Sequence, residues 1–192
     1  MPYIRECIVT TVNRTGAVHI APLGIIAEED GWVIAPFRPS ATLDNLSAVP
    51  FAVANYTDDM RVFAGCLTGR RDWPTLPLEG FAVPRLAGAL AHSVLAVESV
   101  DGDETRPRHF CRVVAEATHA PFTGLNRAKA AVLELAILVS RLNRLPAAKV
   151  DAEIAYLSIA MEKTAGPEER QAWGWLMQRV ADHRVGAGRR QG

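Results

Sequence analysis

The sequence predicts an α+β fold in which an antiparallel, Greek-key-like β-barrel is followed by a helical cap. The first two-thirds of the chain consists of short β-branched segments separated by turn signals. After Pro121 the chain becomes rich in alanine and leucine at helical spacing. Several of the strands are apolar on both faces, which suits a closed barrel with helices packed outside it. We therefore expect a barrel over residues 1–122, a helical cap over 123–185 and a disordered tail over 186–192.

Turn residues separate the expected strands. Residues 13–16 (Asn-Arg-Thr-Gly) make a hairpin turn whose glycine can take a positive φ. Pro22, within the return strand, indicates an edge or a bulge because proline cannot donate to a sheet ladder. The expected strands cover residues 3–12, 17–27, 32–35, 51–56, 86–100 and 108–119.

Three helices are expected after the barrel. The first covers residues 126–144, where apolar side chains recur every three or four positions. The second starts with Asp151 as its N-cap and runs to about Lys163. The third begins at Pro167, because proline is well suited to the first turn of a helix. The tail from Gly186 has no apolar residue to bury.

The charge balance excludes two classes of partner. The chain has 192 residues with 21 basic and 21 acidic side chains, hence no net charge. Proteins that bind nucleic acids or anionic membranes through their charge have a basic excess, which is missing here. The three cysteines form no CxxC pair, so we expect no structural zinc and a reducing, cytoplasmic environment. The first residues carry charges where a signal peptide needs an apolar core.

One segment has the composition of an anion site. The motifs GxGxxG, GxxxxGK[ST], HExxH and GxSxG are absent from the relevant contexts. The segment PFRPSATLDNL (36–46) follows an expected strand and leads into a short helix. It places Arg38, Ser40 and Thr42 around a helix N-terminus, where hydroxyls, free backbone N–H groups and a guanidinium suit a phosphate dianion. The alternative is an ordinary helix start with Ser40 or Thr42 as its cap.

Three strings together resemble an uncharacterised family of FMN-binding split-barrel proteins, related to flavin-reductase-like and pyridoxamine-phosphate-oxidase-like barrels. They are IRECIVTTVNRTGAVHIAPLG, FRPSATLDNL with NYTDDMRVFA, and GLNRAKAAVLELAILVSRL, in the expected order between residues 3 and 145. The resemblance implies FMN at a homodimer interface. It implies that the phosphate lies on Arg38, Ser40 and Thr42, with Asn45 holding the loop or the ribityl chain.

The resemblance also implies contacts with the flavin ring. Thr10, Thr11 and Asn13 would offer hydrogen bonds to the isoalloxazine edge, as would backbone N–H groups near Asn55. Thr10 and Thr11 are equally well interpreted as β-branched strand residues, and Asn13 as a residue that stabilises the turn.

Two further side chains are candidates for the site. His19 lies on the return strand and is the candidate catalytic acid–base, although a strand histidine can simply bond to backbone. Arg127 opens the long helix and would reach the phosphate or a substrate acid, or else is a surface arginine. Asp58 and Asp59 are expected to be solvated turn residues. No role is assigned to His92, His109 or His119. Trp73 is considered only as a residue that would cover the flavin.

The resulting hypothesis is an FMN-dependent oxidoreductase that acts on a small molecule. A reduced nicotinamide nucleotide is the expected transient donor, and a pterin-like substrate follows only from the genomic context of some relatives. The alternative is a flavin-binding carrier, sensor or assembly protein without turnover. A barrel that has lost its flavin and only scaffolds other proteins is a third interpretation.

Overall fold

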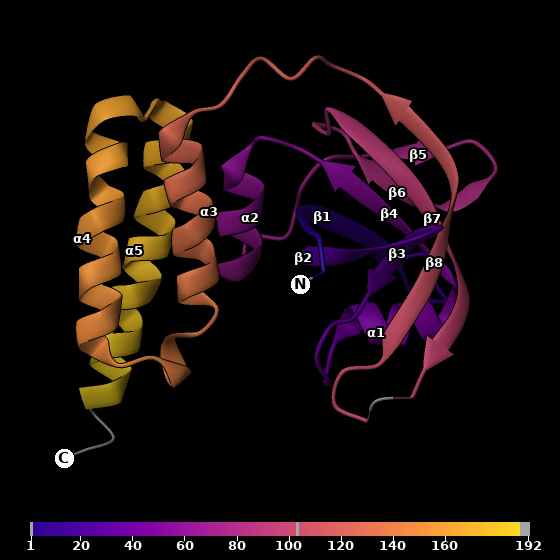
Figure 1. The fold of residues 1–192 in the computed structure, drawn as a ribbon, viewed down its shortest axis with the longest axis horizontal. Helices are drawn as coiled ribbons and strands as arrows, with labels where there is room; N and C mark the ends of the chain where they lie inside the picture. Colours follow the sequence, from indigo (N-terminus) through magenta and orange to yellow (C-terminus); the bar gives the residue numbers. More distant parts are fainter. Residues whose placement is uncertain (1, 103, 189–192) are drawn as a thin grey trace. The chain divides into compact units, whose positions relative to one another are not determined.

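The computed structural model describes residues 2–102 and 104–188 (Figure 1). These form two compact units. The barrel unit comprises the chain up to Asp58 together with Arg71–Phe122, and the helical unit comprises Asp59–Arg70 together with the chain from Thr123.

The barrel unit is built on a closed antiparallel barrel, which confirms the predicted fold class. Its strands follow one another around the barrel in the order β1 (Ile4–Val12), β2 (Val18–Glu28), β3 (Gly31–Ile34), β8 (Arg108–Thr118), β7 (Ala91–Asp101) and β4 (Phe51–Tyr56). The pairing of β4 with β1 closes the barrel. Helix α1 (Ala41–Ala48) connects β3 to β4.

Alternating side chains fill the barrel core. Cys7, Val9, Ile34 and Cys111 pack there with Leu46 of α1, so this helix covers part of the core. At the first hairpin, Gly16 has φ +83°, a conformation that glycine adopts without strain, and Val12 pairs with Val18 across the turn. Pro22 lies on β2 opposite Ile8, in a stretch where β2 does not pair with β3, so its missing donor costs no ladder bond there.

The sequence-based account of the barrel missed one hairpin. Strands β5 (Thr75–Leu78) and β6 (Phe81–Leu86) form a separate two-stranded sheet. Each contains a proline, Pro77 or Pro84, which argues against a strand in the sequence. The strand predicted from residue 86 instead begins at Ala91, because Leu86 belongs to β6.

The helical unit contains α2 (Met60–Leu67), α3 (Arg127–Val139), α4 (Ala147–Thr164) and α5 (Pro167–Gly188), with a single 3₁₀ turn at Leu142–Arg144. Helix α3 packs against α2, α4 and α5. Figure 1 shows these helices side by side. The buried side chains of the helical unit include Phe63, Val132, Leu135, Ala172 and Leu176.

The predictions for this unit differ from the structure at four points. The helix predicted over residues 126–144 ends at Val139, and a 3₁₀ turn follows it. The N-cap prediction for Asp151 is wrong, because α4 begins one turn earlier, after Pro146, and the alanines that follow are strong helix formers. Helix α2 follows directly on the β4 segment, and its N-cap is Asp59, which accepts a hydrogen bond from the Arg61 N–H at 3.0 Å. Helix α5 continues to Gly188, so residues 186–188 are helical; the rest of the predicted tail lies outside the described residues.

None of the helices in the described part of the chain combines the length and apolar character that a membrane crossing requires. All three cysteines are buried, and none of them forms a disulfide in the described chain. Burial raises the thiol pKa of Cys7 and of Cys111 to about 12, so both are packing residues rather than nucleophiles.

Candidate functional site

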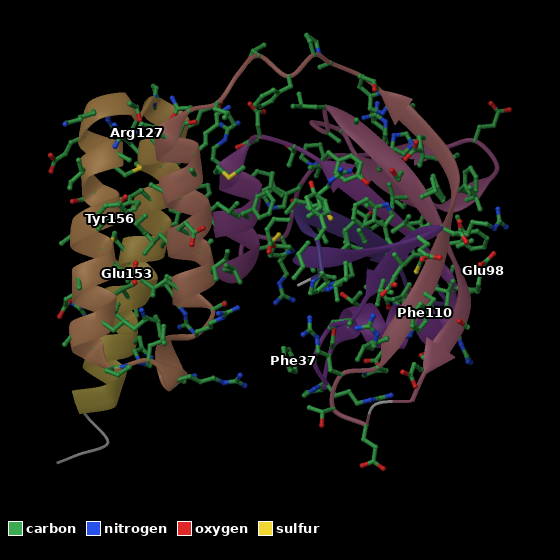
Figure 2. All side chains as sticks on the ribbon, viewed as in Figure 1. Phe37, Glu98, Phe110, Arg127, Glu153 and Tyr156 are labelled. Carbon is green, nitrogen blue, oxygen red and sulfur yellow. The ribbon has the colours of Figure 1, made fainter. Side chains whose placement is uncertain are left out.

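The loop that leads from β3 into α1 is held by the segment that precedes β8. The backbone N–H of Arg38 donates to the Thr105 carbonyl at 3.0 Å. Arg106 Nε donates to the Ala35 carbonyl at 2.6 Å, and its guanidinium lies 4.8 Å from the centroid of the Phe37 ring. Figure 2 labels Phe37 on this loop. The loop is therefore fixed in position before any ligand arrives.

The start of α1 is equipped to bind an anion. Ser40 is the N-cap with extended backbone, φ −155° and ψ 128°, yet its hydroxyl makes no capping hydrogen bond. The Asp44 N–H is the first to bond back, at 3.2 Å from the Ser40 carbonyl, so the preceding N–H groups of the first turn have no helical partner. Arg38 is exposed, and within the described chain its guanidinium has no hydrogen bond or ion pair. These groups together offer positive potential and several donors to a phosphate.

Thr42 and Asn45 lie on the buried side of α1. They are 2% and 7% exposed. Asn45 Nδ2 donates to Thr11 Oγ1 of β1 at 3.0 Å, and Thr11 is itself fully buried. Asn45 and Thr11 therefore anchor the helix that carries the loop, which agrees with the loop-holding role considered for Asn45.

The structure favours a structural role for Thr10 and Asn55. Both are fully buried, and their side chains bond within the barrel unit. Thr10 Oγ1 donates to the Pro84 carbonyl at 2.6 Å, and Asn55 Oδ1 accepts from the Leu86 N–H at 2.7 Å. These bonds tie the β5–β6 hairpin to the barrel and use the side chains of Thr10 and Asn55. Contacts of Thr10 and of the backbone N–H groups near Asn55 with a flavin ring remain predictions.

Asn13 is occupied by the first hairpin turn. Its Oδ1 accepts from the Thr15 N–H at 2.9 Å, the Thr15 hydroxyl at 2.8 Å and the Ala17 N–H at 2.9 Å. This arrangement is a side-chain-stabilised turn, in which Asn13 Oδ1 already accepts three hydrogen bonds. Contact between Asn13 and a flavin ring remains a prediction.

His19 lies opposite Thr11 in the β1–β2 register and is half-buried. Burial, and then the positive charge of Arg71, lower the pKa of His19 below its ordinary value. The imidazole is therefore neutral at neutral pH and can accept a proton or hold a hydrogen bond. A catalytic role for it remains a prediction.

Arg127 belongs to the helical unit. It is exposed at the first position of α3 and lines a groove between α3 and α4 with Ala131, Tyr156 and Ile159 (Figure 2). The preceding residue, Asn126, is the N-cap of α3, and its Oδ1 accepts a hydrogen bond from the Ala128 N–H at 2.8 Å. The assignment of Arg127 to the phosphate stays a prediction.

One histidine that was assigned no role stands out in the structure. His109 is 4% exposed, and its Nδ1 is the one buried side-chain nitrogen or oxygen of residues 2–102 and 104–188 without a hydrogen-bond partner. It pairs with Ile34, the residue at which β3 ends and the loop begins. The alternation His109-Phe110-Cys111 was the available signal, since it places the histidine on the face of β8 that holds the buried Cys111.

A pair of histidines lies at the start of β7 and directly after the end of β8. His92 Nδ1 and His119 Nε2 are 2.8 Å apart, and the two rings stack with centroids 5.0 Å apart. Nearby, Ser93 Oγ donates to Glu116 Oε1 at 2.7 Å. No group of three potential metal ligands occurs in the described residues, so this pair is not part of a recognisable metal centre.

The closed six-stranded antiparallel barrel, with a donor-rich loop before its short helix, defines a split barrel of the flavin-reductase-like class. Family models place the chain more narrowly. Residues 5–120 match the N-terminal domain of a protein of unknown function (DUF447), and residues 126–178 match the second domain of the same family. The chain belongs to this family.

Solved structures agree with this placement. An FMN-bound protein of the same family from Methanosarcina mazei is similar with a TM-score of 0.78 and 18% identity, over 92% of this chain and 94% of that one. The 2-nitrobenzoate 2-nitroreductase of Pseudomonas fluorescens gives a TM-score of 0.51 and 22% identity, over 62% and 64% of the two chains. An NADH:FAD oxidoreductase of Streptomyces globisporus gives 0.51 and 13%, over 62% and 72%. A search of curated protein sequences gave no match.

Proposed function

We propose that this protein binds FMN through its barrel unit, with the flavin phosphate at the start of α1. The observation that carries the proposal is the convergence of an unpaired Arg38 guanidinium, an uncommitted Ser40 hydroxyl and the free N–H groups of the first helical turn. The Methanosarcina relative, described as FMN-bound and similar over nearly its whole length, supports FMN as the phosphate-bearing ligand.

The residues present fit an FMN phosphate. A dianion needs several donors and a compensating charge, which Arg38 and Ser40 supply, and His109, with its unpartnered Nδ1, pairs with Ile34 directly before the same loop. Asn45 and Thr11 keep α1 in place while the phosphate binds. When bound, FMN supplies hydride chemistry at its N5 atom, and the protein supplies binding, orientation and exclusion of water.

The test of FMN binding uses the purified protein. We expect a yellow protein that releases FMN on denaturation, or a colourless protein that binds added FMN. Arg38→Ala should weaken FMN binding about 10- to 100-fold, because a charge-assisted phosphate bond contributes about 1.5–3 kcal/mol. Arg70→Ala, which removes an arginine of the helical unit, is the matched control and should leave the affinity unchanged. A wild-type protein that ignores FMN would contradict the proposal.

We further propose an oxidoreductase of the flavin-reductase type. The Pseudomonas nitroreductase and the Streptomyces NADH:FAD oxidoreductase share the fold, and that likeness supports the reaction class without indicating a substrate. His19, neutral and half-buried, is the proposed proton donor or acceptor. Stopped-flow reduction of the FMN-loaded protein by NADH or NADPH tests this. If neither nucleotide reduces the bound flavin faster than it reduces free FMN, the alternative function is favoured, namely a carrier or sensor without turnover.

Three other expectations remain proposals. They are a homodimer with the flavin at its interface, a pterin-like substrate and a cytoplasmic location. The oligomeric state in solution, with and without FMN, is the first of them to measure.

A further inference from the structure

His109 combines burial with an unsatisfied polar atom. Its side chain is 4% exposed, and Nδ1 has no hydrogen-bond partner in the described chain. A buried polar atom without a partner costs about 1–3 kcal/mol. Native structures tolerate such an atom where a ligand, an ion or a water completes it.

The position of His109 points to the anion site at α1. His109 pairs with Ile34, directly before the loop that carries Arg38 and Ser40. It shares its face of β8 with Cys111, which packs in the same cluster as Leu46 of α1, so this face is the one that α1 covers. The Arg38 charge is also close enough to act on the imidazole.

The surroundings of the imidazole favour an anion over a cation. The charged groups near the loop include the guanidinium of Arg38, that of Arg106, which donates to the Ala35 carbonyl, and one carboxylate, that of Asp44 in the first turn of α1. The pKa of His109 is lowered chiefly by burial; backbone hydrogen bonds with Pro107 and Ile34 act in the opposite sense, and the Arg38 charge lowers the pKa further. An incoming phosphate would offset the positive charge and offer oxygen atoms that accept from an imidazole N–H.

We infer that His109 is a direct ligand of the phosphoryl group held at the start of α1, donating through Nδ1. The inference rests on the proposed FMN site. It adds to that site a residue of β8, whereas the other proposed ligands belong to the loop and to α1. The phosphate is then held by two segments far apart in the sequence. Their mutual contact, Arg38 N–H to the Thr105 carbonyl, keeps those segments in register.

The test compares the wild type and two variants of His109 for binding of two ligands, FMN and riboflavin. In His109→Asn the amide nitrogen occupies about the position of Nδ1 and retains a donor, whereas His109→Leu removes it. We expect His109→Leu to lower FMN affinity about 10- to 100-fold, with His109→Asn within about threefold of the wild type. Riboflavin, which lacks the phosphate, should bind all three proteins equally. His119→Leu, on the exposed part of the same barrel unit, is the control and should behave as the wild type.

Two outcomes would overturn the inference. Equal losses for FMN and riboflavin in His109→Leu would show that His109 only supports the barrel. Unchanged affinity for FMN in both variants would show that the hydrogen-bond partner of His109 Nδ1 is a water molecule and not the phosphate. If the wild-type protein binds no FMN, the proposed function fails separately, and calorimetric titration with inorganic phosphate then decides whether His109 ligates an anion.

A measurement on the unmodified protein covers the case in which His109→Leu fails to fold. In protein labelled with ¹⁵N-histidine, the Nδ1 resonance of His109 should shift on addition of FMN and not on addition of riboflavin. The His119 resonances serve as the internal reference. No shift of His109 with a bound FMN would contradict direct ligation.

Discussion

The buried bond between Asn45 and Thr11 shows how single residues position the proposed site. Asn45 is 7% exposed and Thr11 is fully buried. Their hydrogen bond at 3.0 Å joins α1 to β1. The family resemblance implied that both lie near the flavin, and the structure shows that their bond fixes the helix whose first turn is the proposed phosphate site.

Breaking this bond on one side should destabilise the barrel. Asn45→Leu leaves the Thr11 hydroxyl buried without its partner, which costs about 1–3 kcal/mol. Urea unfolding should show that loss, while Asn45→Leu with Thr11→Val should recover part of it because both polar groups are gone. If the double variant is as unstable as the sum of the two single variants, the pair is not coupled as described.

The stacked pair His92–His119 gives a prediction about pH. Burial first, and then His119 and Arg85, lower the pKa of His92 from its ordinary value of 6.5. The unfolded chain therefore takes up a proton at higher pH than the folded chain, so stability is lost as the pH falls below about 6.5 and levels off below the folded pKa.

NMR titration of the His92 ring protons checks this directly. The midpoint should lie below 6.5 in the wild type. In His119→Gln it should rise slightly and remain below that value, since burial is the larger cause. A wild-type midpoint above 6.5 would mean that the 2.8 Å contact between the rings stabilises the protonated pair.

At the scale of elements, the start of α3 depends on a side-chain cap. Asn126 accepts from the Ala128 and Lys129 N–H groups at 2.8 and 3.2 Å, and its Nδ2 donates to the Thr164 carbonyl at 3.0 Å. One asparagine thus starts α3 and joins it to the end of α4. The sequence predicted that Asn126 opens this helix, whereas its contact with α4 required the structure.

Replacing Asn126 should destabilise the helical unit in two separable steps. Asn126→Asp keeps the acceptor and loses only the bond to Thr164, and Asn126→Ala also loses the cap, which contributes about 1 kcal/mol. Thermal unfolding should therefore rank the wild type first, Asn126→Asp second and Asn126→Ala last. Equal stability of the two variants would show that the cap contributes nothing here.

Elements also differ in how well the sequence predicted them. The six barrel strands were predicted because β-branched runs and turn residues alternate regularly, as around Gly16. The β5–β6 hairpin was not, since Pro77 and Pro84 are ordinarily evidence against strands and its anchors, Thr10 and Asn55, come from distant strands. Tertiary hydrogen bonds outweighed local propensity in that hairpin.

At the scale of the whole molecule, the candidate site was predictable only where it is local. Arg38, Ser40 and Thr42 lie close together in the sequence, so a phosphate role for them could be predicted before the fold was known, and that role stays a prediction. His109 lies on β8, and only the pairing of β3 with β8 brings it next to Ile34, directly before the loop. No periodicity in a single sequence reports such a pairing, which is why the histidine was assigned no role.

The most direct test of the central claim is a crystal structure of this protein with FMN. We predict that the phosphate lies at the start of α1, within hydrogen-bond distance of the Ser40 hydroxyl and the first-turn N–H groups, with the Arg38 guanidinium beside it. A well-ordered FMN whose phosphate lies away from the loop between β3 and α1 would contradict the claim.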